Sequence, residues 1–312
     1  MPTSRRQFLQ QSVTLAAGAL FVPQAFASFA KGESLQISLA QWSLHRTLRS
    51  GKLTNLDFPG VAKKDYNISV VEYVNQFFKD KAEDTAYLNQ LLQRCKDNGV
   101  KNHLIMIDGE GPLADLDAAK RQKAVENHYK WVGAAKHLGC QTIRVNAQGS
   151  GSRQDVQNAG VEGLGKLGEY AAKEGINVIV ENHGGYSSDG EWLSTLMKKV
   201  DQKNVGTLPD FGNFCIKRSA DGCAESYDRY KGTKELMPYA KGVSAKTYDF
   251  DEKGNCVETD YVKIMNILKE AGFSGYVGIE YEGSKISEEE GIRKTKALLE
   301  KVARQLKYKM VA

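Results

Sequence analysis

Short apolar runs recur at intervals along this chain, and longer polar stretches separate them. Each run is rich in β-branched or aromatic residues, which is typical of β-strands. The pattern predicts eight strands, with runs that begin at Leu35, Ile68, His103, Gln141, Asn177, Val205, Gly242 and Tyr276.

The stretches between the runs have the periodicity of amphipathic helices. Apolar residues recur at positions i, i+3 and i+4 in residues 82–99, 118–139 and 162–175. Each of these stretches ends in a glycine, which commonly follows the last turn of a helix. Strands that alternate with helices indicate repeated βαβ units. We therefore predict an α/β fold, a (β/α)8 TIM barrel, with residues 31–312 as a single domain.

Residues 1–30 have the pattern of an export signal. Paired Arg5 and Arg6, followed by Phe8 and Leu9, resemble a twin-arginine motif, and an apolar run leads to small residues around Ala27. We expect a twin-arginine-type signal peptide and a periplasmic protein; an ordinary secretory signal or an uncleaved anchor is the alternative. No later stretch has the roughly 18 apolar residues that a membrane-spanning helix needs, so stable membrane insertion is not expected.

The charge of the chain argues against nucleic acid as a partner. The formal net charge is +5, and it falls to +3 without Arg5 and Arg6, which are the only charged residues in the predicted signal. The remaining positive residues are scattered along predicted helices and form no basic groove.

The chain has five cysteines, and none of them form a CxxC pair, which disfavours a thiolate zinc site. Cys95 and Cys140 lie near predicted helix ends or strand starts, so we expect them in the core. A disulfide between Cys215 and Cys223 is compatible with an oxidising compartment, although their spacing alone leaves it open.

Three carboxylates stand at the ends of predicted strands. Glu181 ends the run NVIVE, Asp210 follows GTLP, and Glu280 follows YVGI. The carboxyl ends of the strands form the mouth of such a barrel, so these acids are expected to converge there. Converging carboxylates repel one another unless a cation lies between them, and this donor set suits Mn²⁺, Mg²⁺, Co²⁺ or Zn²⁺. The alternative is that each acid pairs with Lys246 or Arg144.

Two further residues on strand ends are candidates for the site. His183 lies two positions after Glu181, so it is a candidate metal ligand, with hydrogen bonding or substrate binding as the alternative. Lys246 is a candidate base or a charge that polarises a carbonyl. The alternative for Lys246 is a salt bridge to Glu280 or Asp210.

Candidate substrate contacts lie on other strand ends. Arg144 and Asn146 share one face of the fourth strand and are expected to hydrogen bond to a polyol. Trp42 is expected to stack on a sugar face, with core packing as the alternative. Asp108 lies at the predicted mouth, where it either faces the site or caps a turn. Glu72 is expected to orient a neighbouring group rather than touch the substrate.

At these motifs the chain resembles the xylose isomerase-like barrel proteins, often called sugar phosphate isomerases or epimerases. The resemblance covers essentially the whole predicted mature chain and rests on VIVENHGG, LPDFGNF, GVSAKTYDF and GIEYEG. It implies that Glu181, Asp210 and Glu280 hold a divalent metal together with a histidine on the seventh strand. It also implies that the two glutamates act as acid and base.

The chain departs from the resemblance at two positions. Ser244 stands where the family commonly has the histidine of a V-H-x-K motif, and Asn213 stands where it has a second histidine. The usual metal site is therefore depleted of imidazole. His183 would have to supply one from the neighbouring strand, or Lys246 would take the place of the metal as a fixed charge. Asn213 joins the substrate-binding candidates.

These features predict a metal-dependent isomerase or epimerase. Two carboxylates beside a carbonyl compound can remove and return the proton on the neighbouring carbon. Glu181 and Glu280 are the expected acid/base pair, with Lys246 as the third catalytic candidate. The expected partner is a small carbohydrate without phosphate, because sugar phosphates are largely cytoplasmic.

Several alternatives remain open at this point. A lyase could use the same base and metal for β-elimination on a 3-keto-glycoside. The non-enzymatic alternative is a barrel that binds a carbohydrate without catalysing a reaction, since fold alone does not establish activity. A more distant resemblance to metal-dependent endonucleases at abasic sites fits poorly, because those need several zinc-binding histidines and a basic groove. The sequence does not decide whether the protein forms a homodimer.

Overall fold

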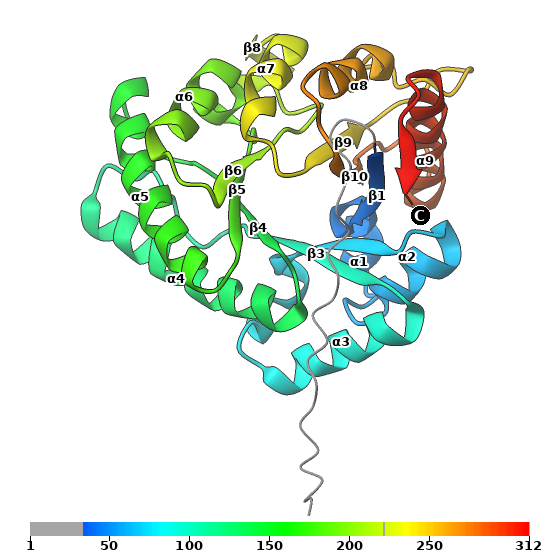
Figure 1. Ribbon diagram of the computed structural model, residues 1–312, viewed down its shortest axis with the longest axis horizontal. Coiled ribbons are helices and arrows are strands. Elements are labelled where there is room, and N and C mark those ends of the chain that lie inside the picture. Colours follow the sequence, from blue (N-terminus) through cyan, green and yellow to red (C-terminus); the bar gives the residue numbers. More distant parts are fainter. Residues whose placement is uncertain (1–33, 221, 312) are drawn as a thin grey trace, which may run out of the picture.

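The computed structural model describes residues 34–220 and 222–311, so the predicted signal over residues 1–30 lies outside the described residues. Parallel strands form a nearly closed barrel at the centre of the molecule, and helices surround it (Figure 1). This arrangement confirms the predicted TIM barrel. The barrel strands are β1 (Ser34–Ala40), β2 (Val70–Val74), β3 (Lys101–Met106), β4 (Thr142–Val145), β5 (Asn177–Glu181), β6 (Val205–Leu208), β9 (Val243–Thr247) and β10 (Gly275–Tyr281).

The helices cover the outside of the barrel in chain order (Figure 1). The α-helices are α1 (His45–Arg49), α2 (Phe58–Tyr66), α3 (Thr85–Asn98), α4 (Ala118–Leu138), α5 (Arg153–Lys173), α6 (Gly190–Val200), α7 (Arg229–Leu236), α8 (Tyr261–Glu270) and α9 (Glu288–Gln305). The short 3₁₀ helices are η1 (Gln41–Leu44), η2 (Asn75–Lys81), η3 (Gly185–Ser188) and η4 (Met237–Tyr239).

Local sequence sets the ends of the predicted helices. α4 begins after Asp117, whose carboxylate accepts hydrogen bonds from the backbone N–H of Ala119 at 2.8 Å and of Lys120 at 3.1 Å. It ends at Gly139, which has the left-handed φ of 71° that favours glycine. α3 begins after Asp84 and ends at Gly99 in the same way. The helix boundaries expected at these glycines are confirmed.

The order of the strands around the sheet is β6-β5-β4-β3-β2-β1-β10-β9. Isolated parallel bridges, Thr207 to Ala240 and Asp210 to Ser244, connect the two ends of this sheet. The backbone N–H of Ser244 donates to the carbonyl of Pro209 at 2.9 Å. The seam between β6 and β9 therefore lies beside one of the predicted site carboxylates.

Alternate residues of each strand point into the barrel, and a small apolar cluster fills part of its interior. This cluster consists of Ala40, Val74, Leu104, Met106, Ile179 and Leu208. Glu72 is also buried, and its carboxylate accepts a hydrogen bond from Ser38 Oγ. A Cβ atom at Gly278 would lie 2.7 Å from Glu72 Oε2, so glycine at this position leaves the room that the carboxyl group occupies. Glu72 bonds to a neighbouring strand, in keeping with the orienting role expected for it.

The structure contains three strands that the apolar pattern did not predict. β7 (Cys215–Ser219) and β8 (Gly222–Ser226) form an antiparallel hairpin where a long loop was expected. The disulfide between Cys215 and Cys223 is present and ties the two strands together, with 5.8 Å between the Cα atoms.

The short strand β11 (Lys309–Val311) pairs with β1. Cys95 and Cys140 are buried, as predicted.

Within the described ranges, no helix combines the length and the apolar character required to cross a bilayer.

Candidate active site

The strand-end carboxylates meet inside the mouth of the barrel. Glu181 is the last residue of β5, Asp210 lies two positions beyond β6, and Glu280 is next to last in β10. One ligand oxygen from each of them lies within 4.8 Å of the others. The three side chains are between 0% and 4% exposed. The structure therefore brings together the acids that the sequence placed at one mouth.

The hydroxyl of Ser244 lies between two of these acids. Its Oγ atom is 2.6 Å from Asp210 Oδ2 and 2.8 Å from Glu280 Oε2. A serine hydroxyl has one hydrogen, so it can donate to only one of the two carboxylates at a time. The second contact requires either a proton on a carboxyl group or a cation that both oxygens share.

Lys246 follows two positions along β9 and also faces the interior. Its Nζ atom lies 3.0 Å from Glu280 Oε1, 3.3 Å from Glu282 Oε2 and 3.8 Å from Asp210 Oδ2. Burial by itself lowers the pKa of Lys246, but the surrounding carboxylates outweigh burial and raise it well above its usual value. The side chain is therefore charged. This geometry favours the salt bridge that the sequence left open, and it gives Lys246 the place of a fixed positive charge rather than of a base.

The turn after β6 holds Asp210 and Asn213 in position. Asp210 Oδ1 accepts backbone hydrogen bonds from Gly212 and Asn213, both at 2.8 Å. The backbone N–H of Asp210 donates to Asn182 Oδ1 at 2.7 Å. Asn213 Nδ2 donates to Glu181 Oε1 at 2.9 Å. Asn213 was a substrate-binding candidate, and here it holds a carboxylate of the site.

Arg144 connects the metal-binding candidates to the cavity wall. Its Nε atom lies 2.9 Å from Glu181 Oε2, an ion pair that lacks hydrogen-bond geometry. Its Nη1 atom donates to Asp108 Oδ1 at 2.8 Å, and Asn146 Nδ2 donates to the same oxygen at 2.8 Å. Burial raises the pKa of Asp108, but Arg144 and Asn146 outweigh it and bring the pKa to about 2. Asp108 is therefore ionised and anchors both of these polar side chains.

The buried acids differ in how easily they ionise. Burial raises the pKa of Glu181 and of Asp210 to about 7, although Arg144 beside Glu181 and Lys246 beside Asp210 counteract part of this effect. Burial acts in the same direction on Glu280, but the adjacent Lys246 ammonium and hydrogen bonds outweigh it and lower the pKa. A bound cation would favour the ionised form of both groups.

The donor set fits a divalent metal ion. Glu181, Asp210, Glu280 and the hydroxyl of Ser244 offer only oxygen ligands, which suit Mg²⁺ or Mn²⁺ better than a zinc site of nitrogen and sulfur. Glu181 Oε2 is buried and accepts no hydrogen bond from the described part of the chain. His183 does not belong to the group of ligand atoms within 4.8 Å. Its role as a ligand stays a prediction.

A cavity of about 300 Å³ lies beside the carboxylates. This volume is at the lower end of the range for small-molecule sites, roughly 300–1,000 Å³. Several predicted residues line it: Trp42, Asp108, Arg144, Asn146, His183 and Glu280. Sequence reasoning did not single out the other lining residues, which are Gln76, Gly109, Gln148 and Glu282. Glu282 lies within GIEYEG, but only Glu280 of that motif was assigned a role.

Trp42 is fixed at the rim of this cavity. Its indole Nε1 donates to Glu282, whose other carboxylate oxygen contacts Lys246. The His45 ring stacks on Trp42 with 5.0 Å between centroids, and the Arg49 guanidinium lies 4.8 Å from the ring centroid. The side chain lines the cavity in a defined orientation, as a stacking surface for a sugar requires.

Comparison with known protein families identifies one match. A family model described as xylose isomerase-like TIM barrel matches residues 61–302. No curated protein matches the chain.

Solved structures with the same fold are similar at low sequence identity. The IOLI protein with a bound zinc atom is 15% identical, with a TM-score of 0.67 over 86% of this chain and 98% of that chain. D-psicose 3-epimerase in the presence of D-fructose is 15% identical, with a TM-score of 0.64 over 85% and 98%. The probable 3-DHS dehydratase AsbF of petrobactin synthesis, from Bacillus anthracis, is 16% identical, with a TM-score of 0.61 over 85% and 98%. At these identities the likeness shows the fold.

Proposed function

The chain belongs to the xylose isomerase-like TIM barrel family, and on that premise we propose that it is a metal-dependent isomerase or epimerase of an unphosphorylated carbohydrate. The family match confirms the resemblance that the strand-end motifs indicated. The observation that carries the proposal is the buried group of Glu181, Asp210 and Glu280, whose ligand oxygens lie within 4.8 Å of one another.

The two glutamates suit a proton transfer next to a carbonyl group. One carboxylate removes the proton from the carbon beside the carbonyl, and the other delivers a proton to the resulting enediolate. When bound, a divalent cation held by Glu181, Asp210 and Glu280 supplies Lewis-acid polarisation of the substrate oxygens. Lys246 adds a fixed positive charge 3.0 Å from Glu280. Arg144 holds Glu181 in its orientation.

The cavity wall supports a polyol as substrate. Trp42 lines the cavity, and the amides of Gln76, Asn146 and Gln148 offer paired donors and acceptors for hydroxyl groups. Among proteins of the same fold, D-psicose 3-epimerase was crystallised in the presence of D-fructose, a sugar without phosphate. The IOLI protein binds zinc, which supports a metal in the proposed reaction.

We infer the compartment from the sequence. The motif at Arg5 and Arg6 supports export to the periplasm, where free sugars are the available substrates. The disulfide between Cys215 and Cys223 is compatible with an oxidising compartment. Cell fractionation of a variant with both arginines replaced by lysine tests this inference, since unchanged export would contradict it.

A second reaction would begin with the same removal of a proton next to a carbonyl group. A lyase that eliminates the group at the anomeric carbon of a 3-keto-glycoside would use the same base. The dehydratase AsbF, which has a similar fold, is in keeping with elimination chemistry in this barrel.

Solvent isotope exchange tests the shared step. The protein, purified without chelators and supplied with Mn²⁺ or Mg²⁺, is incubated in D₂O with a panel of ketoses, aldoses and 3-keto-glycosides. We expect one substrate to gain deuterium at the carbon next to its carbonyl group. NMR measures this incorporation. Products of unchanged carbon content identify an isomerase or epimerase, and a released aglycone identifies a lyase. Saturable binding without exchange would contradict both enzymes and support a binding protein.

Glu280→Gln is the first variant to compare. It keeps the size of the side chain and removes the base, so we expect exchange to slow at least about 100-fold while circular dichroism stays unchanged. Glu270→Gln, on the exposed side of α8, is the matched control and should keep full activity. Equal exchange by the wild type and Glu280→Gln would overturn the assignment of Glu280.

A further inference from the structure

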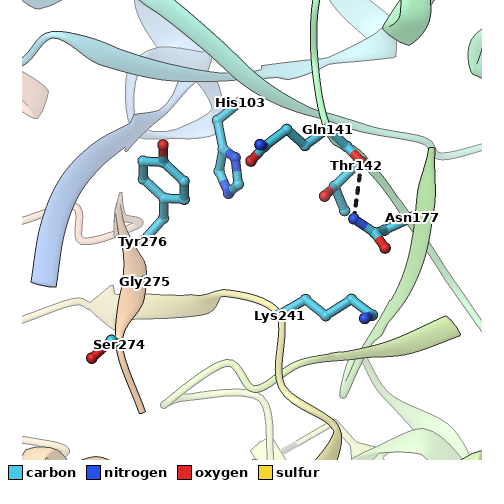
Figure 2. A pocket seen from close by; sticks show the side chains of 8 residues that line it. All are labelled: His103, Gln141, Thr142, Asn177, Lys241, Ser274, Gly275 and Tyr276. Carbon is cyan, nitrogen blue, oxygen red and sulfur yellow. Dashed lines mark hydrogen bonds between the residues drawn. The ribbon is translucent and has the colours of Figure 1, made fainter. Parts of the chain in front are cut away.

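A second polar cavity lies at the opposite end of the barrel, among the residues that begin the strands. Its volume is about 160 Å³. Thr142 begins β4, Asn177 begins β5, and Lys241 lies two positions before β9. Figure 2 shows His103 and the amide of Gln141 on one side of this space and the Lys241 side chain across from them.

His103 is buried and lacks hydrogen-bond partners. It is 2% exposed, and neither ring nitrogen has a partner in the described ranges 34–220 and 222–311. The ring packs against Tyr276 with 3.9 Å between centroids. Burial, with the nearby Lys101, lowers the pKa of His103 to about 3, so the free ring is neutral. A buried imidazole without partners is unfavourable, which points to an occupant of the cavity.

The cavity wall offers donors and positive charge. The amides of Gln141 and Asn177 and the hydroxyl of Thr142 line it together with Lys241. Lys241 Nζ donates one hydrogen bond, to the carbonyl of Lys203 at 2.7 Å, and an ammonium has three hydrogens. None of the described lining residues carries a carboxylate. An occupant with negative charge and several acceptors matches this wall.

We propose that the cavity binds a small oxyanion of the phosphate type between His103 and Lys241. Its oxygens accept from a ring N–H of His103, from the Lys241 ammonium and from the amides that line the space. Thr142 and Arg144 belong to the same short strand, so the anion site and the sugar site lie at opposite ends of β4. The proposal does not depend on the reaction at the sugar site.

Titration with sodium phosphate tests the proposal on the full mature protein, with sodium chloride at matched ionic strength as the reference. Two readouts are followed: the thermal unfolding midpoint and the imidazole signals of ¹⁵N-labelled histidines, with His103→Gln used to assign its ring. We expect phosphate to raise the midpoint in a saturable manner and to move the His103 signals. Lys241→Met should weaken the apparent affinity about tenfold or more, since a charge-assisted hydrogen bond is lost. It should leave sugar conversion unchanged.

Lys173→Met is the matched control, because Lys173 is an exposed lysine at the end of α5. It should bind phosphate as the wild type does. Phosphate that acts no differently from chloride would overturn the proposal. The proposal would also be overturned if phosphate still raised the unfolding midpoint of Lys241→Met and did not move the NMR signals of His103, since the anion would then bind elsewhere. If His103→Gln does not fold, Lys241→Met still decides the outcome. None of these results bears on exchange at the sugar site.

Discussion

Ser244 places one hydroxyl hydrogen between two carboxylates, 2.6 Å from Asp210 and 2.8 Å from Glu280. An imidazole at this position would offer a nitrogen ligand to a metal between the acids. The serine instead leaves the candidate metal site with oxygen ligands alone. Its preference among metals is therefore set by this residue, because oxygen ligands suit Mg²⁺ and Mn²⁺ while nitrogen ligands favour Zn²⁺.

Restoring the imidazole should change the metal that the protein retains. We expect Ser244→His to bind Zn²⁺ at least about tenfold more tightly than the wild type, since it adds a nitrogen ligand. Metal content after dialysis, measured by mass spectrometry, and zinc titration check this. Ser244→Ala, which removes the hydroxyl and adds no ligand, is the control. A histidine variant that retains no more zinc than the alanine variant would show that this position does not face the metal.

Glu72 should make the stability of the protein depend on pH. Burial raises its pKa to about 8 from 4.5, so the folded protein holds a proton that the unfolded chain releases. The contribution of Glu72 to the free energy of unfolding is therefore greatest below pH 4.5. It falls as the pH rises from 4.5 to about 8 and does not change further above that pH. We expect Glu72→Gln to be the more stable protein at pH 8, by a few kcal/mol, and to equal the wild type near pH 5. Urea unfolding at both pH values measures this, and parallel profiles for the two proteins would contradict it.

The sequence predicted the carboxylates of the site better than their partners. Glu181, Asp210 and Glu280 each follow an apolar strand, so the fold brings them together. Glu282 was not singled out, although it lies in GIEYEG, because its contact with Trp42 joins positions 240 residues apart. Such pairings depend on how distant loops meet at the barrel mouth, which strand and helix periodicity does not encode.

At the scale of elements, the barrel strands and the long helices were predictable, and the hairpin of β7 and β8 was not. The barrel strands are apolar because both of their faces are buried. The residues of β8 are all exposed, and those of β7 are mostly so. Without a buried face, neither strand has the alternation of apolar and polar residues that reveals a strand. Their pairing is held by backbone hydrogen bonds and by the disulfide.

The disulfide should protect this hairpin rather than the barrel. We expect a variant with both Cys215→Ser and Cys223→Ser to be cut faster by trypsin after Lys217 and Arg218, which are both exposed in β7. The unfolding midpoint should change by only a few degrees, since the hairpin contributes little to the core. Cleavage after Lys173, on α5, serves as the internal reference. Equal cleavage of both proteins in the hairpin would show that the strands stay paired without the crosslink.

For the whole molecule, a bound cation should stabilise the fold, because the three acids that would hold it come together only in the folded protein. At a metal concentration about 100 times the dissociation constant the gain is roughly 2.7 kcal/mol, or a rise of about 5–10 °C in the unfolding midpoint. Thermal unfolding with Mn²⁺, Mg²⁺ or EDTA measures it. Asp210→Asn should abolish the rise. An identical midpoint in EDTA and in Mn²⁺ would mean that the acids bind no metal.

The barrel has few backbone pairs at the seam between β6 and β9. β9 pairs with β10 at five positions, whereas the isolated bridge that joins it to the β6 side is Asp210 to Ser244. Asp210 and Glu280 come from the segments on either side of β9. A cation shared by them would therefore add a link across this seam, and its binding would also hold the barrel closed.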